Sequence, residues 1–323
     1  MTIHRLYATI DDSTTDVSRG EWRRAADHLQ SIMKDDRFTP RYLSWLYDEN
    51  PDGESVAVDI CDDDGQMIAH GAALPVWLRS RDRSERFVLS VNSAVLPESR
   101  GRNLFATKIL EHIPYVLEQG VVGGFGVTNE RSTVPAVSLD GLGATLIGQL
   151  NLKVCPPMSA GVGVVSYDCS PGFLRSAAFE QIAESLDRQP ARHWVRTWSP
   201  DALRRRLGRP ATHYVLHVAE DAVAVSVKSF ARGVPVAVLL KLLPRGEGDH
   251  QRSGRGLVAA ACRYHRAPSA LYAGFNSWVG LRGISVPRER MPAPLNLLFL
   301  SLSDIDQAEF RFDTFELLDF DAF

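Results

Sequence analysis

The chain has 323 residues, of which 45% are hydrophobic and 23% are charged, and its formal net charge is −3. This length suffices for two domains with separate cores, and the charge argues against a protein that binds nucleic acid non-specifically. The four cysteines lie too far apart for a zinc site and are too few for a disulfide framework, so we expect a cytoplasmic protein that holds no metal. We expect no membrane partner, because the sequence shows no signal-like segment and no run of about 18 apolar residues.

The first half of the chain alternates patterns typical of helices with patterns typical of strands. In chain order, the predicted elements are a helix over 21–35, strands over 54–60, 67–78 and 86–95, a helix over 104–120, and strands over 121–128 and 144–154. The first two strands read as a hairpin. Gly120 is expected to end the second helix, and Pro114 is expected to kink or break it.

After a boundary at 155–163, the second half repeats this order of elements. Its predicted elements are helices over 173–189 and 199–208 and strands over 213–220, 222–230 and 234–243. The segment 99–106 also aligns without gaps with 252–259, which places Gly101 opposite Gly254 at an offset of 153 residues. We therefore predict tandem domains over 1–168 and 169–323, with these two glycines at equivalent turns between a strand and a helix.

A basic loop, "SRGRNLF", joins the strand over 86–95 to the helix that follows. The first N–H groups of a helix lack intrahelical acceptors and carry partial positive charge, so they attract anions. Gly101 lets a phosphate approach the backbone, and Arg100 and Arg102 add charge. No nucleotide P-loop motif precedes the helix. The loop is therefore predicted to hold a phosphate or pyrophosphate; the alternative is an ordinary basic start of a helix.

The strand "LSVNSAV" followed by "RGRNLF" resembles the signature R-G-x-G-x-G/A of the GNAT acyltransferases. Downstream, "GFGVTNERS" and "GLGATLIGQL" resemble later strands of the same family, so the resemblance covers residues 59–157. It implies an α/β protein of two tandem GNAT-like domains, each a mixed, mostly antiparallel sheet flanked by helices. It also implies acetyl-CoA or another acyl-CoA as the acyl donor.

Carried over residue by residue, the resemblance assigns the pantetheine to Ser93, Ala94 and Val95, and the backbone near Val95 would polarise the thioester carbonyl. Asn129 would lie near the thioester. The pyrophosphate would bind the loop residues, which are Arg100, Gly101, Arg102, Asn103, Leu104 and Phe105. Asn103 stands where the family has its second glycine, and asparagine tolerates a positive φ angle better than most residues.

The residues that would move protons are less evident. The tyrosine that often protonates the leaving thiolate in this family has no counterpart in "STVPAVSLDGLG", so no general acid is assigned. His70 is a candidate general base, and Asn92 is a candidate to face the acyl group; alternatively, hydrogen bonds within the sheet satisfy both side chains. His213 and His217 share a strand face, but no third ligand for a metal is evident.

We predict an enzyme that transfers an acyl group, acetyl by expectation, from acyl-CoA to an amine of a small molecule, with the second domain closing over the acceptor. Tandem proteins of this kind occur in bacterial natural-product and polysaccharide gene clusters. One alternative is a Fem-type transferase that uses aminoacyl-tRNA, whose basic groove would be reached by Arg204, Arg205 and Arg206; otherwise these arginines form a solvated helix face. The other alternative is a GNAT-like binding protein without catalysis.

Overall fold

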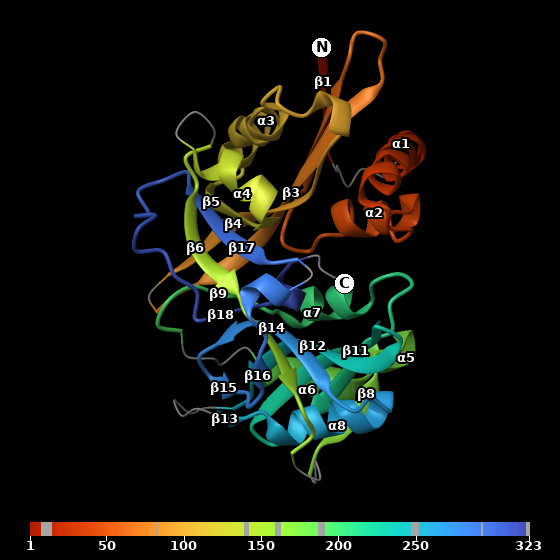
Figure 1. Ribbon diagram of the computed structural model, residues 1–323, viewed down its shortest axis with the longest axis vertical. Helices are drawn as coiled ribbons and strands as arrows, with labels where there is room; N and C mark the ends of the chain where they lie inside the picture. Colours follow the sequence, from red (N-terminus) through yellow and green to blue (C-terminus); the bar gives the residue numbers. More distant parts are fainter. Residues whose placement is uncertain are drawn as a thin grey trace.

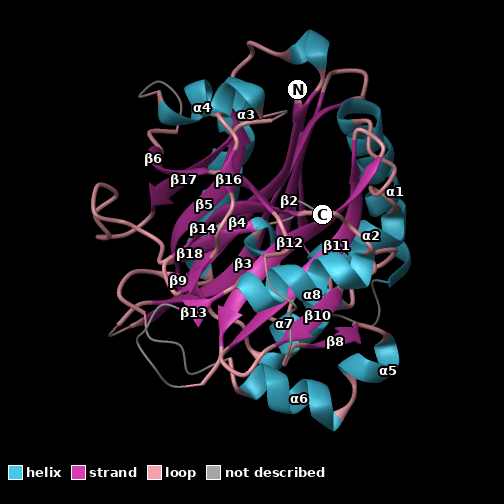
Figure 2. Cartoon of the chain, turned by 60° about the horizontal axis from the view of Figure 1, so that its bottom comes forward, coloured by secondary structure: helices cyan, strands magenta, loops and turns pink. Residues whose placement is uncertain are grey.

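The computed structural model describes residues 1–7, 15–81, 83–138, 142–158, 163–186, 191–246, 252–291 and 293–320. These residues form two large mixed sheets flanked by helices, and the two sheets follow one another along the longest axis of the molecule (Figure 1). Figure 2 shows that strands fill the interior and that helices surround them. The predicted α/β class with two mixed, mostly antiparallel sheets is confirmed.

The first sheet contains the strands of the predicted anion-binding segment. Its strands are β1 (Thr2–Tyr7), β2 (Val56–Cys61), β3 (Met67–Arg79), β4 (Ser84–Val95), β5 (Val121–Asn129), β6 (Thr145–Leu150), β9 (Val195–Arg196) and β17 (Leu295–Ser301). Their order is β1-β2-β3-β4-β5-β17-β6, with β9 beside β3. The pair β4 and β5 is parallel, whereas the other neighbours are antiparallel. Helices α1 (Thr15–Met33) and α2 (Pro40–Tyr47) cover one face, and α3 (Leu104–Glu118) and α4 (Glu130–Val137) cover the other (Figure 1).

The second sheet repeats the central topology of the first. Its strands are β7 (Leu152–Cys155), β8 (Val165–Asp168), β10 (Val215–Val218), β11 (Ala222–Ala231), β12 (Val234–Pro244), β14 (Ala270–Asn276), β16 (Ile284–Ser285) and β18 (Thr314–Glu316). The remaining elements are α5 (Pro171–Leu174), α6 (Ala177–Glu184), α7 (Pro200–Leu207), α8 (Arg255–His265), the short strands β13 (Arg252–Ser253) and β15 (Val279–Gly280), and the 3₁₀ turns η1 (Pro97–Ser99), η2 (Arg288–Arg290) and η3 (Leu317–Asp319). In both halves, three antiparallel strands precede a helix and a strand parallel to the third, as β2-β3-β4-α3-β5 and β10-β11-β12-α8-β14.

The two halves exchange strands. Strand β17 lies between β5 and β6 and is antiparallel to both, whereas β7 pairs with β14 of the second sheet. The single strand predicted over 144–154 therefore divides at Asn151 into β6 and β7, which join different sheets. Strands β7 and β8 precede residue 169 but belong to the second sheet, whereas β17 follows it and belongs to the first. The strands of each sheet are therefore not divided at the predicted boundary after residue 168.

The helices that follow the two repeated segments begin at different places. Gly101 has φ +85° and lies three residues before α3, whereas Gly254 has φ −76° and directly precedes α8. The two glycines therefore lie in corresponding turns, as predicted, but at different positions within them, because α8 begins two residues earlier than the alignment places it. Helix α3 runs through Pro114 without a break.

The C-terminal segment over 310–320 packs against both halves of the protein. Phe310, Phe312 and Phe315 pack into the aromatic core beneath the first sheet, and η3 packs into the core of the second. The buried Lys241 ammonium binds Glu316 at 3.0 Å and Asp319 at 2.6 Å. Removing one member of such a buried set would leave a charge without its partner and is therefore expected to destabilise the fold.

Candidate functional site

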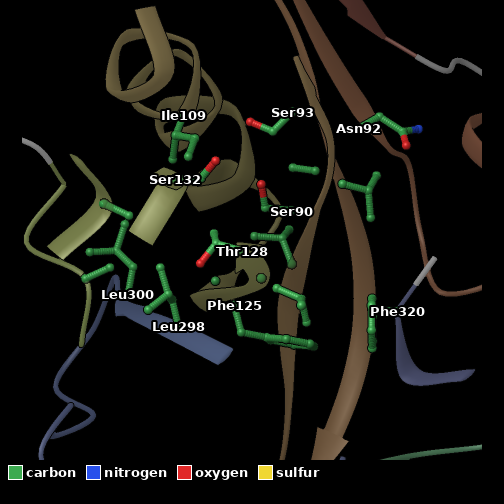
Figure 3. A pocket seen from close by; sticks show the side chains of 18 of the residues that line it. Ser90, Asn92, Ser93, Ile109, Phe125, Thr128, Ser132, Leu298, Leu300 and Phe320 are labelled. Carbon is green, nitrogen blue, oxygen red and sulfur yellow. The ribbon is translucent and has the colours of Figure 1, made fainter. Parts of the chain in front are cut away.

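A cavity of about 470 Å³ passes through the first sheet where β4 and β5 separate. On the face covered by α3 and α4 its wall is mostly apolar and includes Ile109 and Leu298 (Figure 3). On the face covered by α1 and α2 it reaches Phe38 and Phe320. Because the cavity reaches both faces, a ligand held under α3 and a second one beside α2 can meet within the sheet.

The separation of the two strands begins at a bulge in β4. Strands β4 and β5 pair as far as Ser90 and Gly126, and within the described residues they do not pair beyond that point. On the other edge of β4, Asn92 and Ser93 both lie opposite Gly71, because the register with β3 shifts there. Asn92 adopts φ +52°, and the two bulge side chains point to opposite sides of the strand (Figure 3). The bulge thus gives each face of the sheet one polar side chain at the cavity.

The predicted anion-binding turn follows this bulge directly. The chain passes through η1, takes φ +85° at Gly101 and φ +56° at Asn103, and then enters α3. A Cβ atom at Gly101 would meet no atom within 4 Å, so the backbone conformation rather than lack of space calls for glycine. The Asn103 side chain makes no capping hydrogen bond, which leaves the first N–H groups of α3 for a ligand. Arg100 and Arg102 are exposed beside them. The expectation that Asn103 accepts a positive φ is confirmed.

A buried hydrogen-bond chain lies on the α2 face of the bulge. Asp59 Oδ1 is 2.7 Å from His70 Nδ1, His70 Nε2 is 3.1 Å from the Tyr47 hydroxyl, and Asn92 Nδ2 donates to that hydroxyl at 2.7 Å. An ionised Asp59 only accepts, so His70 carries its proton on Nδ1, and Nε2 accepts from Tyr47. The chain therefore runs from the cavity wall at Asn92 to a buried carboxylate. Nearby, burial lowers the pKa of His28 to about 4.

A second polar group lies on the α3 face of the same bulge. Lys108 is 1% exposed, and within the described chain its Nζ has no hydrogen-bond partner. Burial lowers its pKa to about 7. Four residues further along α3, burial together with the nearby Lys108 lowers the pKa of His112 to about 3, and His112 Nε2 is also unpartnered among the described residues. The Ser93 hydroxyl is a third buried group of this kind. Each of these groups is buried at a cost that a bound ligand could offset.

The structure brings together some of the predicted site residues and separates others. Asn92, Ser93, Phe105 and Asn129 line the cavity. The Asn129 side chain also caps α4 by accepting from the backbone N–H of Ser132 at 3.0 Å. Three others pack in hydrophobic cores instead of lining the cavity, namely Ala94, Val95 and Leu104. His70 is fully buried and reaches the cavity only through Tyr47 and Asn92.

Sequence reasoning missed Tyr47 and Lys108. Tyr47 ends α2 and is brought to Asn92 by the packing of α2 on the sheet, for which no local pattern exists. Lys108 did carry a signal, since Leu104, Lys108, His112 and Val116 follow each other at intervals of four and all prove to be buried. A lysine and a histidine on the buried stripe of a helix indicate a polar site beneath it.

In the second half of the chain, protein atoms fill both the turn before α8 and the gap between β12 and β14. The N–H of Gly254, before α8, donates to the Gly280 carbonyl at 3.0 Å, and a Cβ atom there would lie 2.6 Å from the Leu281 side chain. Beyond the paired part of β12 and β14, the Glu316 carboxylate accepts from the N–H of Leu242 at 3.2 Å, and β18 pairs with β14. The second turn and the second splay are therefore filled by protein.

The remaining candidate residues do not converge on a site. His213 Nε2 bonds Asp168 at 2.7 Å, whereas His217 bonds the hydroxyls of Ser166 and Ser226 at 2.7 and 2.8 Å. In the described part of the chain, no group of three or more metal-binding side chains occurs.

The arginines of α7 are bonded within the protein. Arg205 donates to the carbonyls of Trp45 and Leu46, and Arg206 donates to the Phe320 carbonyl. Arg204 donates to the Leu174 carbonyl and to carboxylates of α6 and α7. The reading of this run as a solvated helix face is therefore wrong.

Comparison with known proteins identifies the fold. No protein-family model and no curated protein matches the chain. Among solved structures, Saccharomyces cerevisiae N-myristoyltransferase with bound myristoyl-CoA gives a TM-score of 0.58 at 10% identity, over 93% of this chain and 79% of that one. A probable N-acyltransferase of Enterococcus faecalis gives 0.56 at 11% identity, over 93% and 72%. A GCN5-related N-acetyltransferase of Anabaena variabilis gives 0.55 at 9% identity, over 92% and 72%. The chain therefore has the tandem GNAT fold.

Within the described residues, no helix combines the length and the apolar character that crossing a membrane requires.

Proposed function

We propose that the protein transfers an acyl group from acyl-CoA to an amine of a small molecule. The observation that carries this proposal is the splay of β4 and β5 directly before the turn at 100–105, with the cavity between the strands. The pantetheine would lie along the edge of β4 that β5 leaves unpaired, and the pyrophosphate would bind the N–H groups at the start of α3. The fold shared with N-acyltransferases, one of them solved with myristoyl-CoA, supports the proposal.

Acyl-CoA would bind in the first half. The turn before α3 is open, whereas Gly280 and Leu281 close the turn before α8. We propose that the transferred acyl group is acetyl. The apolar wall continues under α3 as far as Val116 and Leu302, which leaves room for longer acyl groups as well.

The amine would attack from the α2 face, where Asn92 lies at the cavity wall. Its proton would leave toward His70, because Tyr47 can pass its own proton to Nε2 while Asp59 stabilises the imidazolium. The thioester carbonyl would be polarised by backbone N–H groups of β4 beside the bulge. Phe320 would place the C-terminal segment beside the acceptor.

Acetyl-CoA is expected to raise the melting temperature of the protein, because only the folded chain has the turn and the splay. A ligand at about 100 times its dissociation constant stabilises the folded state by about 2.7 kcal/mol. The measurement is a melting curve with acetyl-CoA, CoA and longer acyl-CoAs, followed by an assay of free thiol release with a panel of amines. Unmoved melting curves for all of these ligands would refute the proposal, and binding without turnover would favour the non-catalytic alternative.

The Tyr47→Phe variant is expected to lose about ten- to a hundredfold in turnover while it retains acyl-CoA binding. The substitution removes the hydroxyl that joins Asn92 to His70 and keeps the aromatic packing. Turnover is measured by thiol release with the amine found in the panel, and binding is measured by the shift in melting temperature. Unchanged turnover would show that the chain of hydrogen bonds is only structural.

A further inference from the structure

We propose that Lys108 donates the proton to the departing thiolate of the acyl donor, and thereby acts as the general acid for which the sequence offers no tyrosine. The inference rests on the proposed acyl-CoA function. It starts from the position of the lysine, which is built into the fold opposite the bulge where the cavity crosses the sheet.

Gly71 makes room for this side chain. A Cβ atom at Gly71 would lie 2.8 Å from Cε of Lys108, so the alkyl chain of the lysine lies directly on the backbone of β3. The same glycine pairs opposite Asn92 and Ser93, the two residues of the bulge. Lys108 therefore reaches the level at which β4 and β5 separate, on the face toward which the Ser93 hydroxyl points (Figure 3).

The surroundings of the amine offer it no counter-charge. Its Nζ lies 4.5 Å from the centre of the Phe105 ring, which lines the cavity. Across the described parts of β2, β3, β4, β5 and α4, which pack against α3, no carboxylate forms an ion pair with it. Among the described titratable groups, His112 on α3 interacts electrostatically with Lys108, and His70 on β3 interacts with His112. A buried ammonium in this position gains a counter-charge when an anion enters the cavity.

The donor forms such an anion during the reaction. The amine attacks the thioester carbonyl, and the tetrahedral intermediate then breaks its C–S bond to give the amide and a thiolate. The sulfur takes a proton from Nζ of Lys108 and leaves as a thiol, after which the neutral lysine regains a proton from solvent. The proton of the amine leaves on the opposite face of the sheet, toward Tyr47 and His70, so the overall reaction is thioester plus amine to amide plus thiol.

Lys108 lies behind Phe105 at the cavity wall, and among the described residues that line the cavity none offers this proton as readily. His112 has a pKa of about 3 and is therefore neutral near pH 7, and the wall beyond it is apolar at Ile113, Val116 and Leu302. A lysine whose pKa lies near 7 can both hold a proton before the reaction and release it during the reaction.

The test uses CoA itself and needs no acceptor. The ultraviolet absorbance of the thiolate of bound CoA is followed against pH for wild type and for Lys108→Met, with Lys228→Met on the exposed surface of β11 as the matched control. In wild type and the control, the pKa of the bound thiol is expected to lie about one to three units below its value in Lys108→Met. The same thiol titration in all three proteins would overturn the role of Lys108.

Two further results separate this inference from the proposed function. Failure of wild type to bind CoA would overturn the acyl-CoA function together with this assignment, whereas CoA binding with an unshifted thiol overturns the assignment alone. Lys108→Arg retains the charge but holds its proton too firmly to donate it. It is expected to lower the pKa of the bound thiol and yet to leave turnover about a hundredfold below wild type. Full turnover in Lys108→Arg would show that a positive charge alone supports departure of the thiolate, and would overturn the role of Lys108 as a proton donor.

Discussion

The Lys108→Met variant is expected to be more stable than wild type at pH 7, by about 3–5 kcal/mol in the free energy of unfolding. Burial lowers the pKa of Lys108 from 10.5 to about 7 in the folded protein, whereas the unfolded chain keeps the ordinary value. Below pH 7 the lysine is charged in both states, so the whole cost of burying it opposes folding. Between pH 7 and 10.5 only the unfolded chain holds the proton, and the cost falls by about 1.4 kcal/mol per pH unit.

Urea unfolding of both proteins at pH 7, 8 and 9 measures this difference. The stability advantage of Lys108→Met is expected to narrow steadily as the pH rises, and Lys228→Met is expected to show no such trend because its side chain is exposed. A Lys108→Met variant that is less stable than wild type at pH 7 would contradict the absence of a partner for the amine. A gain in stability with a loss of turnover is the pattern expected where an active site holds a group under strain.

The Arg100→Ala variant is expected to weaken CoA binding by about tenfold to a hundredfold. A hydrogen bond between a guanidinium and a phosphate contributes about 1.5–3 kcal/mol, and Arg100 lies exposed beside the open turn before α3. Arg255→Ala is expected to have much less effect, because the turn before α8 is closed by Gly280 and Leu281. Calorimetric titration of wild type and both variants with CoA measures the difference.

Melting curves without ligand are the control for these two variants. Arg100 is exposed, so its replacement is expected to leave the melting temperature unchanged within the usual range of surface substitutions. Loss of CoA binding in Arg255→Ala together with full binding in Arg100→Ala would place the ligand in the second half of the chain.

Local sequence patterns predicted the part of the fold that surrounds the turn. The hairpin β2–β3, the strands β4 and β5, and helix α3 follow from apolar periodicity and from glycines at the ends of elements. Asn103 was predicted to take a positive φ because an asparagine stood where the backbone needs that conformation, and it has φ +56°. These features depend on steric preferences of neighbouring residues, and such preferences can be read from a short stretch of sequence.

Contacts between distant segments could not be predicted in this way. The pattern over 144–154 reads as one continuous strand, and nothing in it shows that Asn151 separates strands of two sheets. The approach of Tyr47 to Asn92 depends on how α2 lies against the sheet, which periodicity does not specify. The closed second turn likewise depends on Leu281, which follows Gly254 by many residues and carries no motif.

The exchange of strands between the two sheets sets the order in which a newly made chain can fold. Strand β5 finds its neighbour β17 only after residue 301 has been synthesised, although β5 itself ends at Asn129. At a synthesis rate of about 5–20 residues per second, the edge of β5 stays open for roughly ten to thirty seconds. An open apolar strand edge is a template for aggregation during that time. The cavity between β4 and β5, which Leu295, Leu298 and Leu300 of β17 help to line, is likewise complete only after residue 301 has emerged.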